Sequence, residues 1–422
     1  MKNIAIIGTG IAGLGCAHFL HHQFALTFYE KNDYAGGHVN TVSIPGGNGS
    51  IAVDTGFMVF NKVSYPNLTR LFRELGVAIK PAPMSFSVQH LPTALEYSGA
   101  SLNQLFAQRK NLVRLRFWKM IREINRFNSE ALTAMGAPRY QDYKLGDYLR
   151  VRKYSEDVLN FYLVPMSSAV WTMPPGSLLE VPATALLRFF YNQGFLGLKN
   201  DGAWYTIENG AKAYVEKITG PFRDKIQLRR AAMTVRRLGG RVEVTDAAGR
   251  AEIFDHVIFA SHADETLRML ADADAEERGV LGEFKYQPNT VLLHTDASLM
   301  PKTRACWSSW NFRVAAGADG GAASSTVYWM NNLQGLSDRQ DYFVSINGGN
   351  FVKPDTIIKR IVYEHPVFSL NGMRAQWRLP KLNERRNNVF FCGSYFRHGF
   401  HEDAFTSALE LCRLLTGKRL LG

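Results

Sequence analysis

Three glycines near the N-terminus have the spacing of a dinucleotide-binding turn. Gly8, Gly10 and Gly13 follow an apolar run that starts at Ile4, and the helical pattern IAGLGCAHFL begins directly after them. In such a turn, Gly8 allows a tight bend and Gly10 lets the backbone approach a pyrophosphate. Gly13 lets the helix pack closely on the strand. The phosphate charge would lie at the helix N-terminus, where free N–H groups and the helix dipole favour an anion.

A carboxylate also stands at the position expected for an acid that binds the ribose of a dinucleotide. Glu30 ends a second strand pattern, ALTFYE, 22 residues after Gly8, and can accept hydrogen bonds from a ribose diol. An acid at this position disfavours the 2′-phosphate of NADP. Isolated G-x-G-x-x-G motifs also occur where the glycines serve only packing, but here the strand, the helix and the acid stand in register. We therefore predict a dinucleotide site, whose further contacts include Ile11, Ala12 and Lys31.

Composition limits the class of protein. The 422 residues are 46% hydrophobic and carry a formal charge of +12, which suits a globular protein with a negatively charged partner. Four scattered cysteines favour neither a disulfide framework nor a metal site. The first strand starts at about Lys2, with no room for a signal peptide, and no apolar run reaches the length of a membrane span. We expect a cytoplasmic protein, with peripheral contact to the inner face of the membrane as a further hypothesis.

The elements that must position these residues come from separate parts of the chain. We predict an α/β fold with a doubly wound, Rossmann-like nucleotide-binding domain made of residues 1–61, 206–262 and 371–422. An interleaved α+β domain would comprise residues 62–205 and 263–370. Such interleaving places a pocket at the junction of the two domains, which is a common place for ligands.

The motifs together resemble the FAD-dependent amine oxidase superfamily, which includes phytoene-desaturase-like and protoporphyrinogen-oxidase-like enzymes. GTGIAGLGCA and EKNDYAGGH look like its N-terminal fingerprint, VDTG at 53–56 is similar to its flavin-proximal turn, and CGSYFRHGFHEDA resembles its C-terminal motif. The resemblance implies FAD as the cofactor and a substrate site in the second domain. By the matched motifs the cofactor contacts would also include Gly36, Gly37, His38, Thr55, Gly56, Ala232, Gly393, Ser394, Glu402, Asp403 and Ala404. Ser394 and Ala404 depart from the acid and the glycine common in the family.

Further segments, including MSFSV, WSSWNF and YWMNNLQ, most resemble a bacterial branch of FAD oxidoreductases. A similar module forms the N-terminal part of plant cyclopropane fatty acid synthases. This resemblance implies oxidation or desaturation of a modified fatty acyl or other lipid-like substrate, by hydride transfer from C–H to flavin. Two alternatives stay open: an amine or amino-acid oxidase, and a flavin-stabilised lipid-binding or scaffold protein without turnover. The basic balance and the absence of an acid cluster in the second domain disfavour a polyamine oxidase.

Few residues stand out for the chemistry itself, because a flavin performs the difficult step. His401 is the candidate for proton transfer, since imidazole titrates near neutrality; the alternative is a histidine held by packing. Glu402 and Asp403 have a similar alternative as helix-capping acids. Five large aromatic residues either line an apolar tunnel or belong to an ordinary core: Trp171, Trp307, Trp310, Tyr328 and Trp329.

Residues 101–127 read as one basic helix. Its cations include Arg109, Arg114 and Lys119, with Glu123 as the one acid. Such a helix can lie in the interface of an anionic membrane. Alternatively, its apolar stripe packs on its own domain. No nucleic-acid motif accompanies the charges, so we expect no nucleic-acid partner.

Overall fold

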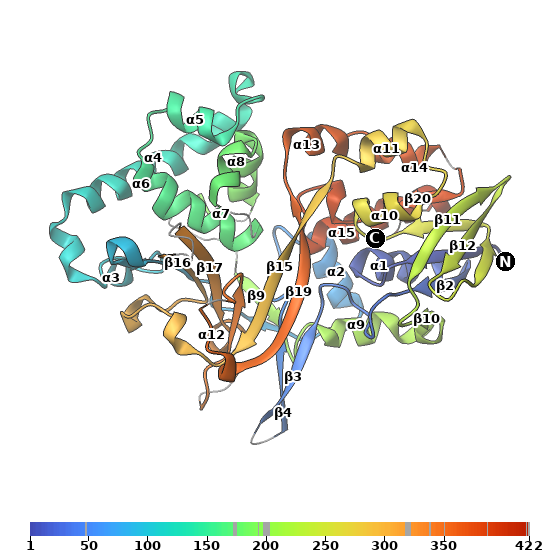
Figure 1. Cartoon of the computed structure of the whole chain (residues 1–422), viewed down its shortest axis with the longest axis horizontal. Helices are drawn as coiled ribbons and strands as arrows, with labels where there is room; N and C mark the ends of the chain where they lie inside the picture. Colours follow the sequence, from blue (N-terminus) through green and yellow to red (C-terminus); the bar gives the residue numbers. More distant parts are fainter. Residues whose placement is uncertain are drawn as a thin grey trace.

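The computed structural model describes residues 1–46, 49–171, 175–192, 194–196, 203–316, 322–336, 339–349, 351–385, 387–418 and 420. Figure 1 shows a parallel sheet with its helices on the right and a larger, mainly antiparallel sheet capped by helices on the left. No helix of the described residues is long and apolar enough to cross a membrane.

A five-stranded parallel sheet carries the N-terminal motif. Its order is β10-β2-β1-β14-β20. The strands are β1 (Asn3–Ile7), β2 (Ala25–Tyr29), β10 (Ile226–Gln227), β14 (His256–Phe259) and β20 (Val389–Phe391). Counted along the chain, this order is 3-2-1-4-5, as in a doubly wound nucleotide-binding fold. The predicted fold class is confirmed.

Both faces of this sheet are covered, which explains the unbroken apolar run of β1. Ile4 and Ile6 belong to a core with helices α1 (Ile11–Leu20), α2 (Pro66–Glu74), α9 (Lys212–Thr219) and α15 (His401–Thr416). Ala5 and Ile7 belong to a second core on the other face, as the period of two along a strand requires. That face is covered by β11 (Ala232–Leu238), β12 (Arg241–Asp246), β13 (Ala251–Phe254), α10 (Ala263–Met269), α11 (Ala275–Leu281), α13 (Leu370–Gln376) and α14 (Leu379–Glu384).

The larger sheet has seven strands in the order β19-β15-β18-β17-β16-β7-β8, antiparallel except for the pair β16 and β7. Its strands are β7 (Phe86–His90), β8 (Leu95–Ser98), β15 (Lys285–His294), β16 (Trp310–Ala316), β17 (Ala322–Trp329), β18 (Phe343–Ile346) and β19 (Ile357–Val367). The helices beside it are α3 (Leu102–Leu105), α4 (Leu115–Gly136), α5 (Leu145–Val151), α6 (Glu156–Val158), α7 (Val164–Trp171), α8 (Ala183–Asn192) and α12 (Met330–Gln334).

Two small sheets lie between the larger ones. They pair β3 (Thr41–Gly46) with β4 (Gly49–Asp54), and β9 (Trp204–Ile207) with both β5 (Phe60–Asn61) and β6 (Ile79–Pro81).

Two segments pack differently from the predicted domain boundaries. Leu68 and Leu71 of α2 lie in the core that α1 and α15 share, although the sequence placed residues 62–205 in the second domain. Likewise, Ala263 and Val280 of α10 and α11 join the core beneath β11 to β13. The reason is local amphipathicity, because each helix turns one apolar face to the nearer sheet. The domain division itself stays a prediction.

The predicted single helix at 101–127 is wrong. The segment forms the short helix α3, a 3-10 turn at Arg109–Val113 and then α4, with an extended residue at Arg114. Phe106 and Phe117 from either side of the turn pack in one core against Val88 of β7. In a straight helix these two residues would lie about 16 Å apart along the axis, whereas their ring centroids are 5.7 Å apart. Tertiary packing therefore overrides the helical pattern.

Candidate functional site

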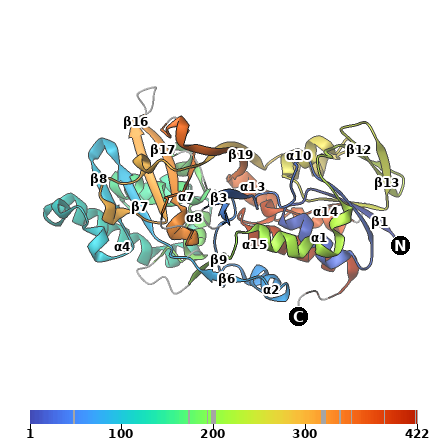
Figure 2. The same ribbon diagram turned by 90° about the horizontal axis from the view of Figure 1, so that it is seen from below.

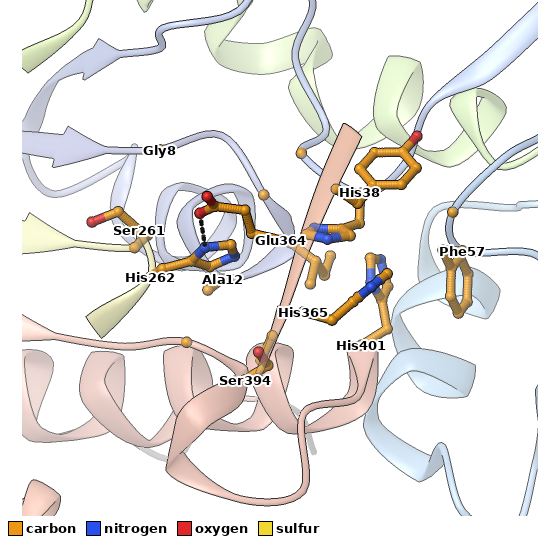
Figure 3. A pocket seen from close by; sticks show the side chains of 18 of the residues that line it. Gly8, Ala12, His38, Phe57, Ser261, His262, Glu364, His365, Ser394 and His401 are labelled. Carbon is orange, nitrogen blue, oxygen red and sulfur yellow. Dashed lines mark ion pairs between the residues drawn. The ribbon is translucent and has the colours of Figure 1, made fainter. Parts of the chain in front are cut away.

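A cavity of about 800 Å³ lies at the carboxyl ends of the parallel strands. Gly8, Glu30, Ser261 and Gly393 line it, and each follows the end of a different strand of the five-stranded sheet. In doubly wound folds, ligands bind in the crevice outside these strand ends. Figure 3 shows how β1, the start of α1, β19 and the segment before α15 converge there.

The three motif glycines differ in what a side chain would meet. Gly8 has a left-handed φ of +102°, and a Cβ at Gly13 would come within 2.1 Å of the Gly8 carbonyl oxygen. Both positions therefore exclude other residues for reasons of the protein backbone. Gly10 is different, because a Cβ there meets no protein atom within 4 Å. The missing side chain of Gly10 leaves open space in the cavity at the N-terminus of α1.

Glu30 fastens the glycine turn to the end of β2. Its carboxylate is 4% exposed and accepts hydrogen bonds from the Thr9 backbone N–H at 3.0 Å and the Thr9 hydroxyl at 2.5 Å. The Asn32 N–H donates to its other oxygen at 2.8 Å. A carboxylate has about four acceptor positions, so a ribose diol at the cavity wall finds acceptors left.

The second glycine pair and the C-terminal motif complete this end of the cavity. The Gly36 N–H donates to the Thr9 carbonyl at 3.0 Å, and a Cβ at Gly37 would lie 3.0 Å from the Gly10 Cα. The Gly393 N–H donates to the Ser407 hydroxyl at 2.8 Å, inside α15. The predicted cofactor residues that line the cavity are Gly8, Gly10, Ile11, Ala12, Glu30, Lys31, Gly36, Gly37, His38, Gly56, Ala232, Gly393, Ser394 and Ala404.

Four predicted contacts do not line it: Gly13, Thr55, Glu402 and Asp403. Gly13 packs against the glycine turn itself. The Thr55 hydroxyl donates to the Asn40 carbonyl at 2.7 Å and contacts the Tyr363 hydroxyl at 2.9 Å. Thr55 therefore stabilises its own turn, and at this turn Gly56 lines the cavity instead of Thr55.

Glu402 faces away from the cavity. Its two carboxylate oxygens accept the N–H groups of Asn67 and Leu68, each at 2.9 Å, so the side chain caps the N-terminus of α2. Burial raises the pKa of this carboxyl, although the α2 N–H groups oppose the shift. The capping alternative describes Glu402, because the free N–H groups of α2 offer partners that the sequence does not reveal.

Asp403 caps its own helix. Its carboxylate accepts the N–H groups of Phe400 at 2.9 Å and His398 at 3.2 Å. Burial raises its pKa to about 7. The capping alternative thus describes both acids, and a direct cofactor contact of either one stays a prediction.

His401 is a packed histidine. Its ring stacks on Phe57 with centroids 4.1 Å apart, and its Nε2 lies 2.5 Å from the Tyr214 hydroxyl. Burial lowers its pKa to about 3. A base this weak, already hydrogen-bonded, is poorly suited to proton transfer near neutral pH. The packing alternative describes His401, whose ring forms part of the cavity wall (Figure 3), and its catalytic role stays a prediction.

Besides His401, four histidines line the cavity, His38, His262, His365 and His398, and the first three lie close together. His262 and His365 were not among the predicted site residues. The ring of His38 lies 5.5 Å from that of His365 and 5.9 Å from that of His262. Burial is the main cause that lowers the pKa of each ring, to about 4 for His365. The buried Nδ1 of His262 has no hydrogen-bond partner and lies 3.8 Å from the Glu364 carboxylate. His262 follows β14 closely, but His365 comes from the other sheet, so only the tertiary fold assembles the group.

Among the residues that the structure describes, the other end of the cavity is lined by aromatic and aliphatic side chains and by no charged one. Its lining residues are Phe57, Met58, Val59, Tyr65, Phe195, Trp204, Trp310, Tyr328, Phe368 and Phe400. Of the five aromatic residues with two alternative roles, Trp310 and Tyr328 line the cavity, whereas Trp307 and Trp329 contact each other edge to face in a separate core. The side chain of Trp171 lies outside the described residues. The core alternative therefore describes Trp307 and Trp329.

The site fits a dinucleotide. An open cradle at a helix N-terminus suits a pyrophosphate, and a buried carboxylate at the end of β2 suits a ribose. The cations at the cavity wall, Lys31 and Arg268, are already paired with Glu265 and Asp264. The backbone N–H groups of the glycine turn are therefore the main donors for phosphate oxygens.

Comparisons with known proteins agree with this architecture. Residues 6–75 match the family model of an NAD(P)-binding Rossmann-like domain. Over the whole chain, the structure is similar to a CLA-producing fatty acid isomerase from P. acnes, with a TM-score of 0.69, 15% identity and 99% of each chain covered. It is similar to wild-type putrescine oxidase bound to putrescine, with a TM-score of 0.67, 13% identity and 99% of each chain covered. Cyclohexylamine oxidase from Brevibacterium oxydans IH-35A gives a TM-score of 0.69 at 15% identity, with 98% and 99% covered. The chain shares the fold of these proteins.

Proposed function

We propose that the protein is an FAD-dependent oxidoreductase that removes a hydride from a C–H bond of a lipid-like, fatty acyl substrate. The observation that carries the proposal is the division of one cavity into a glycine-lined nucleotide end and an uncharged aromatic end. The fold shared with a fatty acid isomerase and two amine oxidases supports a redox or isomerase chemistry on C–H bonds.

FAD would be held by the nucleotide end. Glu30 would accept hydrogen bonds from the ribose next to Ala232, and the α1 N–H groups at Gly10 would bind the pyrophosphate. Gly393 and Ser394 extend the same wall toward the aromatic end, and this extension favours FAD over the shorter reach of NAD. When bound, the flavin supplies the hydride acceptor.

The residues of the chain itself would then bind and orient the substrate and exclude water from it. Phe57 and His401 form a stacked pair at the wall, and Trp310 and Tyr328 contact each other edge to face with centroids 5.5 Å apart. Such rigid rings bury an apolar chain and keep water from the reacting carbon. The neutral imidazoles of His38 and His365 offer hydrogen bonds without adding charge.

The charge distribution favours a lipid over a polyamine. All three carboxylates at the cavity wall lie at the nucleotide end: Glu30, Glu265 and Glu364. Glu30 is engaged by the Thr9 turn and Glu265 by Lys31, whereas Glu364 lies 3.8 Å from the Nδ1 of His262. A dication entering the aromatic end would meet no carboxylate of the described residues there to offset its desolvation.

The cofactor proposal is tested by denaturing the purified protein and identifying the released ligand by mass. FAD is expected. Recovery of NAD, or of no nucleotide after expression with ample flavin, would refute it.

The substrate proposal is tested by anaerobic flavin reduction with fatty acids, phospholipids and amines. Bleaching by acyl lipids and not by polyamines is expected. Trp310→Leu should slow bleaching or raise the lipid concentration that it needs. The matched control Trp307→Leu changes the same residue type outside the cavity and should leave both unchanged at equal flavin content. Rapid bleaching by an amine, with no response to any lipid, would instead support an amine oxidase, and no bleaching at all would support a binding protein.

A further inference from the structure

The turn between α3 and α4 exposes an unusual group of apolar side chains. Within 17 residues, five large apolar side chains are exposed: Leu102 (75%), Leu112 (48%), Val113 (84%), Leu115 (86%) and Trp118 (47%). We call these five residues the apolar tip. Scattered exposed apolar residues are ordinary, but a contiguous group marks an interaction surface.

The apolar tip is held in place by the core behind it. Phe106 and Phe117 are buried on either side of the turn, and the buried Asn111 lies between them. The Trp118 ring packs on Phe106, and its indole N–H donates to the Leu112 carbonyl at 2.9 Å. The exposure is thus a consequence of the folded turn, because the same core that buries the phenylalanines forces Val113 and Leu115 outward.

Cations surround the apolar tip. From residue 101 to residue 122 the chain carries no Asp or Glu. Its six basic residues are all exposed: Arg109, Lys110, Arg114, Arg116, Lys119 and Arg122. From neighbouring elements, Asp157 of α6 pairs with Arg116, the exposed Glu156 lies next to Asp157, and Glu123 is buried with its carboxylate on Ser155. The surface around the tip therefore keeps a net positive charge.

The tip also lies at an end of the molecule. Figures 1 and 2 both place α3 and the start of α4 at the end of the long axis opposite to the N-terminus, away from the five-stranded sheet. A projecting group of apolar residues ringed by cations can enter a lipid surface without obstruction from the rest of the chain.

We propose that the apolar tip is a docking site for an anionic lipid bilayer, in which the apolar side chains enter the interface and the surrounding cations face lipid phosphates. Trp118, with an apolar ring and a polar N–H, is a residue type that favours this depth. A lipid surface fits better than a protein groove because the six exposed basic residues outnumber the two nearby acids, Glu156 and Asp157, around the tip. The proposal does not depend on the cofactor or the substrate.

Vesicle co-flotation of the full-length protein tests the proposal, with phosphatidylcholine vesicles with and without 30% phosphatidylglycerol (roughly the anionic fraction at which surface potential attracts basic residues). Binding to the anionic vesicles only is expected, and salt should weaken it by screening. Replacing Leu112, Val113 and Leu115 together with Ser should reduce partitioning by about 100-fold or more. Replacing Arg114 and Lys119 with Gln should reduce it about 20- to 30-fold.

The matched controls replace exposed apolar and basic residues that lie outside the apolar tip. Val63, Ile253 and Trp377 are exposed apolar residues outside the tip, and their triple replacement with Ser should leave partitioning unchanged. Arg236 and Lys381, exposed on other elements, serve as the charge control with Gln. Equal loss in tip and control variants would overturn the proposal. The proposal would also be overturned if the protein bound no vesicles and formed a concentration-dependent dimer that the tip variant abolishes. That result would identify the tip as an interface between copies of the chain.

Discussion

Gly10 offers a direct test of the nucleotide site, because its replacement should separate folding from cofactor binding. Gly10 is the N-cap of α1 with φ −64° and ψ 174°, a conformation open to any residue. A Cβ there meets no protein atom within 4 Å. Gly10→Ala therefore introduces no clash in the protein itself, and its methyl group enters the space proposed for the pyrophosphate.

Two small terms act on stability, and they offset each other. Alanine is the poorer N-cap, at about 0.5–1 kcal/mol. It also reduces the freedom of the unfolded chain, which stabilises the fold by about 0.4–1 kcal/mol. We expect the free energy of unfolding of the FAD-free protein to change by less than about 1 kcal/mol.

The effect on the cofactor is much larger. Displacing the pyrophosphate from the helix N-terminus loses about two charge-assisted hydrogen bonds, each worth about 1.5–3 kcal/mol. With about 1.4 kcal/mol for each tenfold change, the affinity for FAD should fall by roughly 10²- to 10⁴-fold. Urea unfolding of the FAD-free protein gives the first quantity, and FAD titration followed by flavin fluorescence gives the second.

Gly99→Ala is the matched control, since a Cβ there also meets nothing within 4 Å and Gly99 does not line the cavity. It should leave FAD affinity unchanged. A Gly10→Ala protein that keeps wild-type FAD affinity would refute the assignment of the turn. One that fails to fold would refute the geometry around Gly10.

Three further changes test the neighbouring elements. Gly13→Ala places a Cβ 2.1 Å from the Gly8 carbonyl oxygen. We therefore expect the free energy of unfolding, measured in urea, to fall by about 3 kcal/mol or more, beyond the cost of ordinary overpacking. A stable variant would contradict the close approach of α1 to the glycine turn. Glu402→Ala removes the acceptor of two α2 N–H groups. It should lower the free energy of unfolding by about 3 kcal/mol and leave the affinity for FAD nearly unchanged. A loss of affinity without a loss of stability would instead identify Glu402 as a cofactor ligand. The pKa of Asp403 is raised to about 7 in the folded state by burial, above its value of about 4 in the unfolded chain. The native state therefore holds the proton more tightly, and stability should fall as pH rises from about 4 to 7. Asp403→Asn should flatten this slope in denaturation measured across that range, and an unchanged slope would contradict the burial of the carboxyl.

Much of the nucleotide end could be predicted from the sequence because its determinants are local. The spacing of Gly8, Gly10 and Gly13 fixes a turn between one strand and one helix, and the position of Glu30 follows from the length of a single β-α-β unit. The resemblance placed the motifs at both ends of the chain on one cofactor, and the lining of the cavity includes residues of both.

The sequence could not decide between two roles where a side chain can bind more than one kind of partner. Glu402 and Asp403 could serve a cofactor or a helix N-terminus, and only the position of α2 made the choice for Glu402. His401 has the same residue type in either role, but its environment of Phe57 and Tyr214 holds it neutral.

The glycine turn and the carboxylate at the end of β2 could thus be predicted from the residues alone, because they depend on positions close together in the chain. The doubly wound fold joins three separated parts of the chain, and its prediction also rested on the resemblance of the motifs at both ends. Only the tertiary structure decided which acids cap helices, that His262 and His365 join His38, and that the turn at Leu112–Leu115 points outward. Each of these depends on packing between segments far apart in sequence, where burial and the supply of free backbone N–H groups are set by the whole fold.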